Sequence, residues 1–175
     1  AWDIHACSGI LFNHESPLRG SEFVTRKISI GVAEILKGHR ASISLGNLNA
    51  ERDWGFAGDY VNAMWLMLQQ EKAKDYVVAT GKAHSVREFV EKAFNVVDIT
   101  IEWIEDNGIE NGHCKKSGKI LVDINKDHNR PSETDHLLGD ASKAKKELNW
   151  QPKINVEPLV EMMVKKDLIR LESNG

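Results

Sequence analysis

Two cysteines in 175 residues, Cys7 and Cys114, are too few and too far apart to form a disulfide framework or a Cys-x-x-Cys zinc motif. Free thiols are typical of a reducing compartment, so we expect a cytoplasmic protein. The apolar runs are far shorter than the roughly 20 residues that cross a bilayer. Residues 1–5 also lack the basic and apolar regions of a signal peptide, and the missing initiator Met predicts that the sequence begins within a longer one.

An excess of charge of either sign is absent as well. Lys and Arg number 23 against 26 Asp and Glu, which gives a net charge of -3, and no long basic run occurs. Neither nucleic acid nor a membrane is therefore an expected partner. A chain of this length can bury a sizeable core without disulfides or metals.

Several motifs of catalysis and cofactor binding are missing. No two glycines show the G-x-G spacing of a dinucleotide-binding loop, and no G-x-x-x-x-G-K-[ST] phosphate loop occurs. The seven histidines never stand four residues apart, so no zinc site is expected. Neither Tyr60 nor Tyr76 has a lysine four residues later, which removes the Tyr-x-x-x-Lys pair of short-chain dehydrogenases. The chain carries no complete catalytic apparatus, and we assign no catalytic residue.

The apolar pattern predicts an α/β chain of short strands and medium helices. We expect strands at 4–11, 43–45, 75–79, 100–104 and 119–124, and helices at 23–36, 59–70, 85–97, 140–148 and 157–171. Gly38 should end the first helix, and the capping box Ser85-x-x-Glu88 should begin the third. The second helix should bury its apolar side, which consists of Val61, Met64, Trp65 and Leu68. We expect 105–118 to be an insertion-like loop without regular structure.

Four polar turns are candidates for ligand binding, and two of them combine polar groups of different kinds. Residues 13–20 follow a predicted strand, and ligands of α/β proteins bind beyond the carboxyl ends of strands. The alternative for this turn is a capped connection into a helix. Arg130 and Glu133 share another turn, where they suit a phosphate and a sugar hydroxyl, or pair with each other.

The other two turns carry basic groups. Arg26 and Lys27 stand at the start of a helix, where free backbone N–H groups favour a phosphate, and the alternative is a solvated helix face. Arg52 precedes Asp53 and Trp54, and its rigid fork suits a pyrophosphate. The alternative is a surface Arg52 paired with Asp53, with Trp54 in the core. Together these turns favour an anionic ligand such as a nucleotide diphosphate.

The same turns carry a resemblance to a known family. The segments are Gly9-Ile10-Leu11-Phe12-Asn13-His14-Glu15-Ser16-Pro17, Phe23-Val24-Thr25-Arg26-Lys27-Ile28, Leu45-Gly46-Asn47-Leu48, Arg52-Asp53-Trp54-Gly55, Asp59-Tyr60-Val61, Met67-Leu68-Gln69-Gln70, Ala79-Thr80-Gly81, Ser85-Val86-Arg87 and Leu138-Gly139-Asp140. They closely resemble the GDP-mannose 4,6-dehydratase family, which belongs to the extended short-chain dehydrogenases. The likeness runs in order along the chain and is interrupted around 105–118.

The resemblance implies a fold and a domain plan. It covers only the C-terminal portion of that family, namely the last Rossmann strand or strands and the small α/β substrate-binding domain. Residues 1–20 would end the Rossmann portion and form a connecting turn, and 21–175 would form the substrate-binding portion with its insertion-like loop. The N-terminal Rossmann half, with the catalytic Thr, Glu, Tyr and Lys of the family, would have to be supplied as a partner.

The resemblance also implies site residues and a reaction. His14 and Arg19 would contact NADP, and the residues that would bind the substrate are Asn13, Lys27, Arg52, Arg130 and Glu133. In the family, a hydride passes from C4 of the mannose to NADP, water is lost across C5 and C6, and the hydride returns to C6. The product is GDP-4-keto-6-deoxy-mannose, a step toward GDP-fucose. The resemblance also implies that the complete enzyme can assemble into a homo-oligomer.

Three hypotheses for the chain itself follow. It is a fragment of such a dehydratase, a sugar-nucleotide binding module without catalysis, or one half of a split enzyme. The missing initiator Met and the start within a strand favour the fragment.

Overall fold

The computed structural model describes residues 4–125 and 134–173. Within them the chain forms two compact units that alternate along the sequence, so each unit is assembled from three separate segments. The first unit draws on 1–16, 51–84 and 136–159, and the second on 17–50, 85–135 and 160–175. In the described part of the chain, no helix has both the length and the apolar character that crossing a membrane requires.

Among the described residues, three pairs of strands in the first unit are parallel. The pairs are β1 (Gly9–Leu11) with β6 (Tyr76–Val78), β2 (Asn13–Glu15) with β5 (Trp54–Phe56), and β4 (Glu51–Arg52) with β11 (His136–Leu137). The predicted strand at 4–11 is therefore too long, because β6 offers only three residues for pairing. The predicted polar turn after it is wrong at its start, where Asn13 already belongs to a strand.

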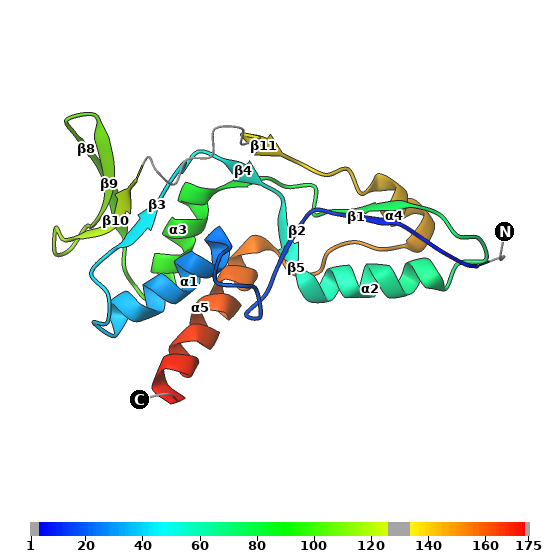
Figure 1. Cartoon of the computed structure of the whole chain (residues 1–175), viewed down its shortest axis with the longest axis horizontal. Coiled ribbons are helices and arrows are strands. Elements are labelled where there is room, and N and C mark those ends of the chain that lie inside the picture. The colour runs from blue at the N-terminus through cyan, green and yellow to red at the C-terminus, as the bar shows by residue number, and fades with distance from the viewer. Residues whose placement is uncertain (1–3, 126–133, 174–175) are drawn as a thin grey trace. The chain divides into compact units, whose positions relative to one another are not determined.

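Two helices cover β6 of the first unit. Both α2 (Ala57–Leu68) and α4 (Ser142–Leu148) contact this strand, and Figure 1 shows α2 running along the β1–β6 pair. Their apolar side chains form one core cluster of Tyr60, Ala63, Met67, Tyr76, Val78, Ala144, Leu148 and Trp150. Asp140 precedes Ala141, the N-cap residue of α4, and its carboxylate accepts a hydrogen bond from the backbone N–H of Ser142 at 2.8 Å.

The predicted orientation of α2 is wrong. The buried side of the helix consists of Asp59, Tyr60, Ala63 and Met67, whereas Val61, Met64, Trp65 and Leu68 are exposed. Both sets are apolar at helical spacing, so periodicity alone identifies the helix without choosing its face. Tertiary packing determines which face of α2 is buried, because Tyr60 and Met67 pack against side chains of β6 and α4 in the core.

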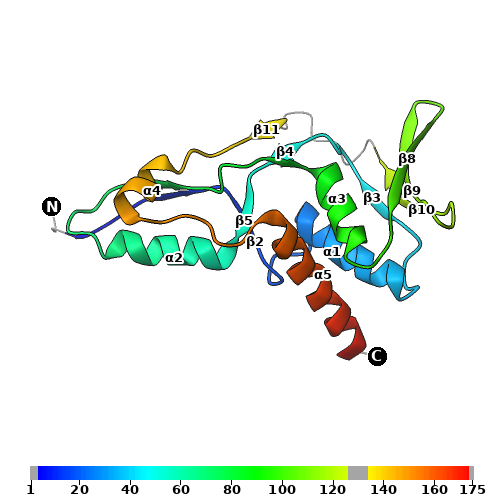
Figure 2. The same cartoon turned by 180° about the vertical axis from the view of Figure 1, so that it is seen from behind.

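The second unit is built on a four-stranded sheet with the order β3-β10-β9-β8. Its strands are β3 (Ile43–Leu45), β8 (Ile101–Asp106), β9 (Ile109–Cys114) and β10 (Ile120–Ile124). Helix α1 (Val24–Leu36) contacts β3 and α3 (Val86–Asn95), and Figure 2 shows this arrangement from behind. Gly31 permits the close approach, because a Cβ there would lie 2.6 Å from Cγ1 of Ile43.

The predicted helix ends of the second unit are confirmed. Gly38 follows α1 with a φ of 74°, a conformation that glycine adopts without strain. Ser85, the last residue of β7 (His84–Ser85), caps α3 by accepting a hydrogen bond from the backbone N–H of Glu88 at 3.1 Å. Helix α5 (Val156–Ser173) contributes most of its length to this unit.

The prediction of an unstructured loop at 105–118 is wrong. Strands β8 and β9 pair in an antiparallel hairpin from Ile101 opposite Cys114 to Asp106 opposite Ile109. Asn107 and Gly108 form its two-residue turn with φ angles of 52° and 76°. Asn-Gly is the dipeptide that such turns favour, so the signal for a hairpin is present in the sequence.

Candidate functional site

The structure distributes the predicted site residues between the two units. Asn13, His14 and Arg52 lie in the first unit, Arg19 and Lys27 lie in the second, and Arg130 and Glu133 lie outside the described residues. Within the first unit, the parallel register sets Asn13 beside Trp54 and His14 beside Gly55. Asn13 lies beside Trp54, and Arg52 stands two residues before Trp54. The β2–β5 pairing therefore brings the segments of Asn13 and Arg52 together, although these residues are 39 positions apart in the sequence.

The His14 ring is held by its own backbone. Its Nδ1 lies 3.0 Å from the carbonyl oxygen of Phe12, and its centroid lies 5.4 Å from that of Tyr60. Since a carbonyl can only accept, this hydrogen bond places the imidazole proton on Nδ1. The Nε2 atom is then the ring nitrogen that can accept a hydrogen bond from a ligand.

Asp53 anchors the segment that follows Arg52. Its side chain is 0% exposed, and its two oxygens accept four hydrogen bonds. Oδ1 accepts from the backbone N–H of Thr80 at 2.8 Å and from its hydroxyl at 2.6 Å. Oδ2 accepts from the backbone N–H groups of Gly81 at 2.9 Å and Gly139 at 3.3 Å. A buried carboxylate with this many donors is a structural anchor.

This anchoring corrects one alternative for Arg52. Asp53 is buried rather than at the surface, and Trp54 is in the core as that alternative required. Arg52 itself is half-buried, and its Nη1 donates to the carbonyl oxygen of Glu51 at 2.8 Å. Because Asp53 and Trp54 are fixed, the backbone from which the Arg52 guanidinium projects is also fixed.

Tyr60 is a buried polar group for which the sequence alone predicts no role. Its hydroxyl is buried and, among the described residues, has no hydrogen-bond partner. Burial raises the pKa of Tyr60 well above its ordinary value, and the nearby carboxylates, led by that of Asp53, raise it further. The phenol is therefore neutral at physiological pH.

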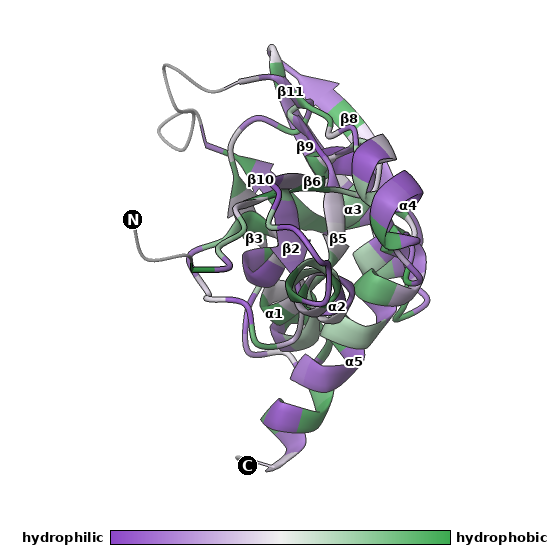
Figure 3. Cartoon of the chain, turned by 90° about the vertical axis from the view of Figure 1, so that its right-hand side faces the viewer, coloured by the Kyte–Doolittle hydropathy of each residue, from purple (hydrophilic) through white to green (hydrophobic). Residues whose placement is uncertain are grey.

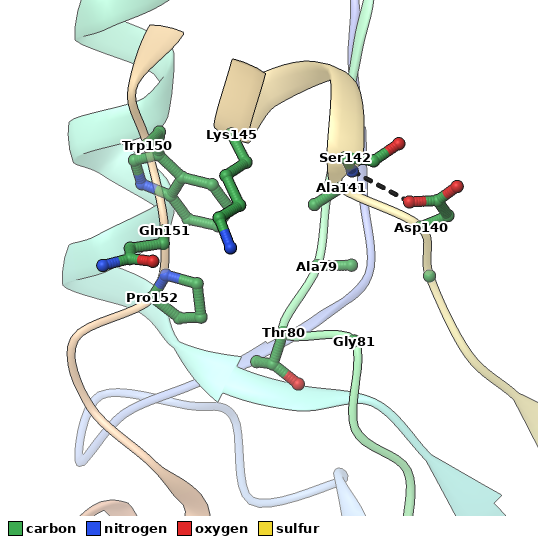
Figure 4. A pocket seen from close by; sticks show the side chains of 11 residues that line it. Ala79, Thr80, Gly81, Asp140, Ala141, Ser142, Lys145, Trp150, Gln151 and Pro152 are labelled. Atoms are coloured by element: carbon green, nitrogen blue, oxygen red, sulfur yellow. Dashed lines mark hydrogen bonds between the residues drawn. The ribbon is translucent and has the colours of Figure 1, made fainter.

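A hollow of about 430 Å³ opens at the carboxyl end of β6 in the first unit. Its lining consists of Ala79, Thr80, Gly81, Gly139, Asp140, Ala141, Ser142, Lys145, Trp150, Gln151 and Pro152. Figure 4 shows Lys145 lying beside Trp150, while Asp140 is turned to cap Ser142. Of the predicted site residues that the structure describes, none lines this hollow. In the sequence, the feature that could indicate this hollow is the Ala79-Thr80-Gly81 turn, which follows a strand.

In the second unit, Lys27 is influenced by burial, by one cation and by one carboxylate. The residue is half-buried on the first turns of α1. Burial lowers the pKa of Lys27, the positive charge of Arg40 lowers it further, and the carboxylate of Asp123 opposes these effects. Asp123 also accepts a hydrogen bond from the Ser42 hydroxyl at 2.7 Å. Arg40 itself forms an ion pair with Glu34 at 2.6 Å.

Arg26 does not serve as the phosphate ligand that its position at a helix start suggested. Its guanidinium is buried and forms an ion pair with Asp167 of α5. Ser29 donates to the same carboxylate at 2.8 Å, and Arg170 donates to its other oxygen at 3.0 Å. The solvated-face alternative for Arg26 is wrong as well, because this network ties α1 to α5.

Arg19 lies over an aromatic ring of the same unit. Its guanidinium carbon is 3.4 Å from the centroid of the Phe23 ring, a cation–π contact that holds the side chain near the start of α1. Among the described residues, no group of three or more His, Cys, Asp or Glu side chains is arranged to hold a metal ion.

Solved structures share this fold at low sequence identity. A protein named RMD from Pseudomonas aeruginosa, solved with NADPH, matches 95% of this chain with a TM-score of 0.76 and 17% identity. A UDP-glucose-4-epimerase from Stenotrophomonas maltophila, solved with NAD, matches 98% with a TM-score of 0.72 and 16% identity. The match covers 48% and 50% of those chains, respectively. This chain therefore shares the α/β fold of about half of each of these proteins.

Curated relatives are much closer in sequence. A GDP-mannose 4,6 dehydratase of Dictyostelium discoideum is 57% identical over 168 residues, and that of Homo sapiens is 52% identical over 174 residues. These alignments cover 96% and 99% of this chain but 47% of each relative, so the chain spans about half the length of the curated relatives it matches. The family model described as GDP-mannose 4,6 dehydratase matches residues 1–163. The chain therefore belongs to the GDP-mannose 4,6-dehydratase family.

Proposed function

We propose that this chain is the substrate-binding, C-terminal part of an NADP-dependent GDP-mannose 4,6-dehydratase. The reaction oxidises C4 of the mannose, removes a hydrogen from C5 and the hydroxyl from C6 as water, and delivers the hydride to C6 and a proton to C5. The net change is the loss of one water from the sugar. The observation that carries the proposal is that identity above 50% to dehydratases extends over nearly the whole chain.

Basic side chains in each unit, considered separately, support a ligand that carries phosphate groups. Lys27 is a half-buried ammonium on the first turns of α1, and it can form a charge-assisted hydrogen bond to a phosphate. Arg52 projects from the segment that Asp53 anchors, and its planar fork matches a phosphate bidentately. Asn13, on the strand beside Trp54, is assigned to the sugar nucleotide. Arg130 and Glu133 are assigned to its nucleotide-sugar end, as the family resemblance implies.

His14 and Arg19 are assigned to NADP, as the family resemblance implies. His14 presents Nε2 as an acceptor, since its Nδ1 is bonded to Phe12, and Arg19 offers a guanidinium to a phosphate. The sequence contains no glycine-rich loop for the pyrophosphate, so most of the cofactor must be held elsewhere. When bound, NADP takes the hydride from the sugar and returns it. His14 and Arg19 would orient the cofactor without taking part in the hydride transfer.

The domain plan belongs to the same proposal. Residues 1–20 end the Rossmann-type portion, and 21–175 form the substrate-binding portion. An N-terminal Rossmann half completes the enzyme, because this chain lacks the glycine loop and the Tyr-x-x-x-Lys pair. Assembly of the complete enzyme into a homo-oligomer is compatible with this plan.

The test is an enzyme restored by joining the N-terminal half of the Dictyostelium discoideum relative to this chain. With GDP-mannose and NADP, the joined protein should form a 4-keto sugar nucleotide, detected by its mass, whereas the isolated chain should not. An inactive but folded joined protein, or an active isolated chain, would contradict the proposal.

Two variants of the joined enzyme test the substrate residues. Arg52→Lys loses the bidentate contact and should lower kcat/KM by an amount equivalent to about 1.5–3 kcal/mol, the range for hydrogen bonds to charged groups. NADP affinity should stay unchanged, since the cofactor contacts are assigned to other residues. Arg170→Lys, a matched change outside the site, is the control. If Arg52→Lys retains normal kcat/KM, the diphosphate role is wrong.

Lys27→Met removes the ammonium and keeps most of the apolar stem. It should weaken GDP-mannose binding about tenfold or more, as expected for one charge-assisted contact. Because the pKa of Lys27 is lowered, binding by the parent should decline as pH rises toward the ordinary lysine range, and the Lys27→Met variant should lack that part of the decline. Calorimetric titrations of both proteins across this pH range measure the difference.

A further inference from the structure

Helix α2 presents an apolar stripe to solvent. Val61, Met64, Trp65 and Leu68 recur at the spacing of one helix face, and they are 62%, 39%, 58% and 58% exposed. We call these four residues the α2 stripe. The opposite side of the helix is buried in the core of the first unit. Exposed apolar residues normally occur singly, whereas a contiguous set on one face marks an interaction surface.

The composition of α2 strengthens this interpretation. The single charged residue of the helix, Asp59, is buried, where it accepts hydrogen bonds from the backbone N–H groups of Lys153 and Ile154. A helix with one face in solvent normally carries charged residues on it, and a helix that is apolar all round is normally buried all round. Figure 3 views α2 nearly end-on and shows hydrophobic colours around its turns.

The two strands next to α2 are also incompletely covered. β1 and β6 form a parallel sheet of two strands, and Ile10 of β1 is 56% exposed. Parallel sheets are covered on both faces, and a two-stranded sheet is at best marginally stable by itself. Further strands and covering helices are therefore required beside β1 and α2. A second copy of α2 would cover the stripe but would not supply strands.

We propose that the α2 stripe is the docking surface for the half of the enzyme that this chain does not span. The curated relatives are about twice as long as their match to this chain, so they contain a segment of comparable length that can provide both the strands and the covering helices. The proposal rests on the proposed function in that a nucleotide-binding half completes the enzyme. Beyond that function, the α2 stripe is assigned as the surface of this chain that the other half covers.

Thiol labelling tests the proposal without relying on activity. Cys7 and Cys114 are replaced by Ser, and a single cysteine is introduced by Val61→Cys or Leu68→Cys in the stripe. Ile169→Cys, at a residue of α5 that is 52% exposed, is the matched control. Each variant is prepared as the isolated chain and as the joined protein, and labelling rates are measured with a small maleimide at several protein concentrations.

The stripe cysteines should react at rates similar to the control in the isolated chain and at least about tenfold more slowly in the joined protein, while the control does not change. Equal labelling in both proteins would overturn the proposal. Protection in the isolated chain that increases with concentration would also overturn it, because a second copy would then be the occupant. A protected but inactive joined protein would contradict the proposed function alone, and an active, unprotected one would contradict the docking surface alone.

Discussion

Replacing Asp53 by Asn is the most informative single perturbation of the fold beneath the proposed site. The carboxylate receives two donors on each oxygen, from Thr80 on Oδ1 and from the backbone of Gly81 and Gly139 on Oδ2. An amide keeps one acceptor oxygen and turns an NH₂ group toward the other pair of donors. With the amide oxygen toward Thr80, the backbone N–H groups of Gly81 and Gly139 lose their acceptor; with the NH₂ group toward Thr80, the Thr80 hydroxyl can turn to accept from it, but the Thr80 backbone N–H loses its acceptor. In either orientation the hydrogen bonds that remain lose their ionic character.

The magnitude follows from these contacts. Hydrogen bonds to charged groups contribute about 1.5–3 kcal/mol each, and the Gly139 contact is the weakest because of its 3.3 Å length. In either orientation at least one buried backbone N–H faces the new NH₂ group without an acceptor, and we expect a cost of about 3 kcal/mol in the free energy of unfolding. Asp53→Ala loses all four bonds and should cost more than Asp53→Asn.

The assay is urea unfolding followed by circular dichroism, with Asp98→Asn as the matched control. Asp98 is exposed and has a φ of 58°, a conformation that Asn tolerates, so the control should stay within about 0.5 kcal/mol of the parent. If Asp53→Asn unfolds at the same urea concentration as the parent, the reasoning about the buried carboxylate is refuted.

Further substitutions test the packing within each of the two units by the same assay. Tyr60→Phe removes a buried hydroxyl that has no partner among the described residues and should stabilise the chain by about 1 kcal/mol, whereas Tyr76→Phe, which loses a 3.0 Å hydrogen bond, should destabilise it by a similar amount. Above pH 10, the loss of stability that comes from the raised pKa of Tyr60 should disappear in Tyr60→Phe, because only the unfolded tyrosine releases its proton there. Asp167→Asn should cost about 3–5 kcal/mol by leaving Arg26 buried without its counter-charge, and Arg26→Met with Asp167→Leu should recover most of that loss. Gly139→Ala should destabilise the first unit, because its Cβ would overlap that of Ala79. A neutral result for any of these would contradict the corresponding contact.

Elements governed by local interactions were predictable from the sequence. The spacing of apolar residues located α1 and α3, and Gly38 and Ser85 marked their ends correctly. Caps and glycine ends act within one helical turn, so their effect is visible in a few neighbouring residues. The Asn107–Gly108 turn is equally local, but the polar residues around it favour a loop, and that pattern hides the hairpin.

The orientation of α2 was decided only by tertiary packing. The helix carries two apolar sets, one around Tyr60 and Met67 and the other around Val61 and Leu68, and a single sequence does not rank them. The choice depends on β6 and α4, whose residues stand up to about 90 positions away and pack against the first set. The same choice leaves the second set exposed and creates the surface assigned to the other half of the enzyme.

For the site, the sequence by itself determined the family and the residue types that suit a sugar nucleotide. It did not distinguish Arg26 from Lys27, two adjacent basic residues at the start of α1. The tertiary structure separated them: Arg26 is neutralised by Asp167, 141 positions along the chain, whereas Lys27 is half-buried, and burial, followed by the charge of Arg40, lowers its pKa. Burial and counter-charges supplied by distant segments decide whether a basic side chain holds the fold together or remains available to a ligand, and such partners come together only when the chain folds.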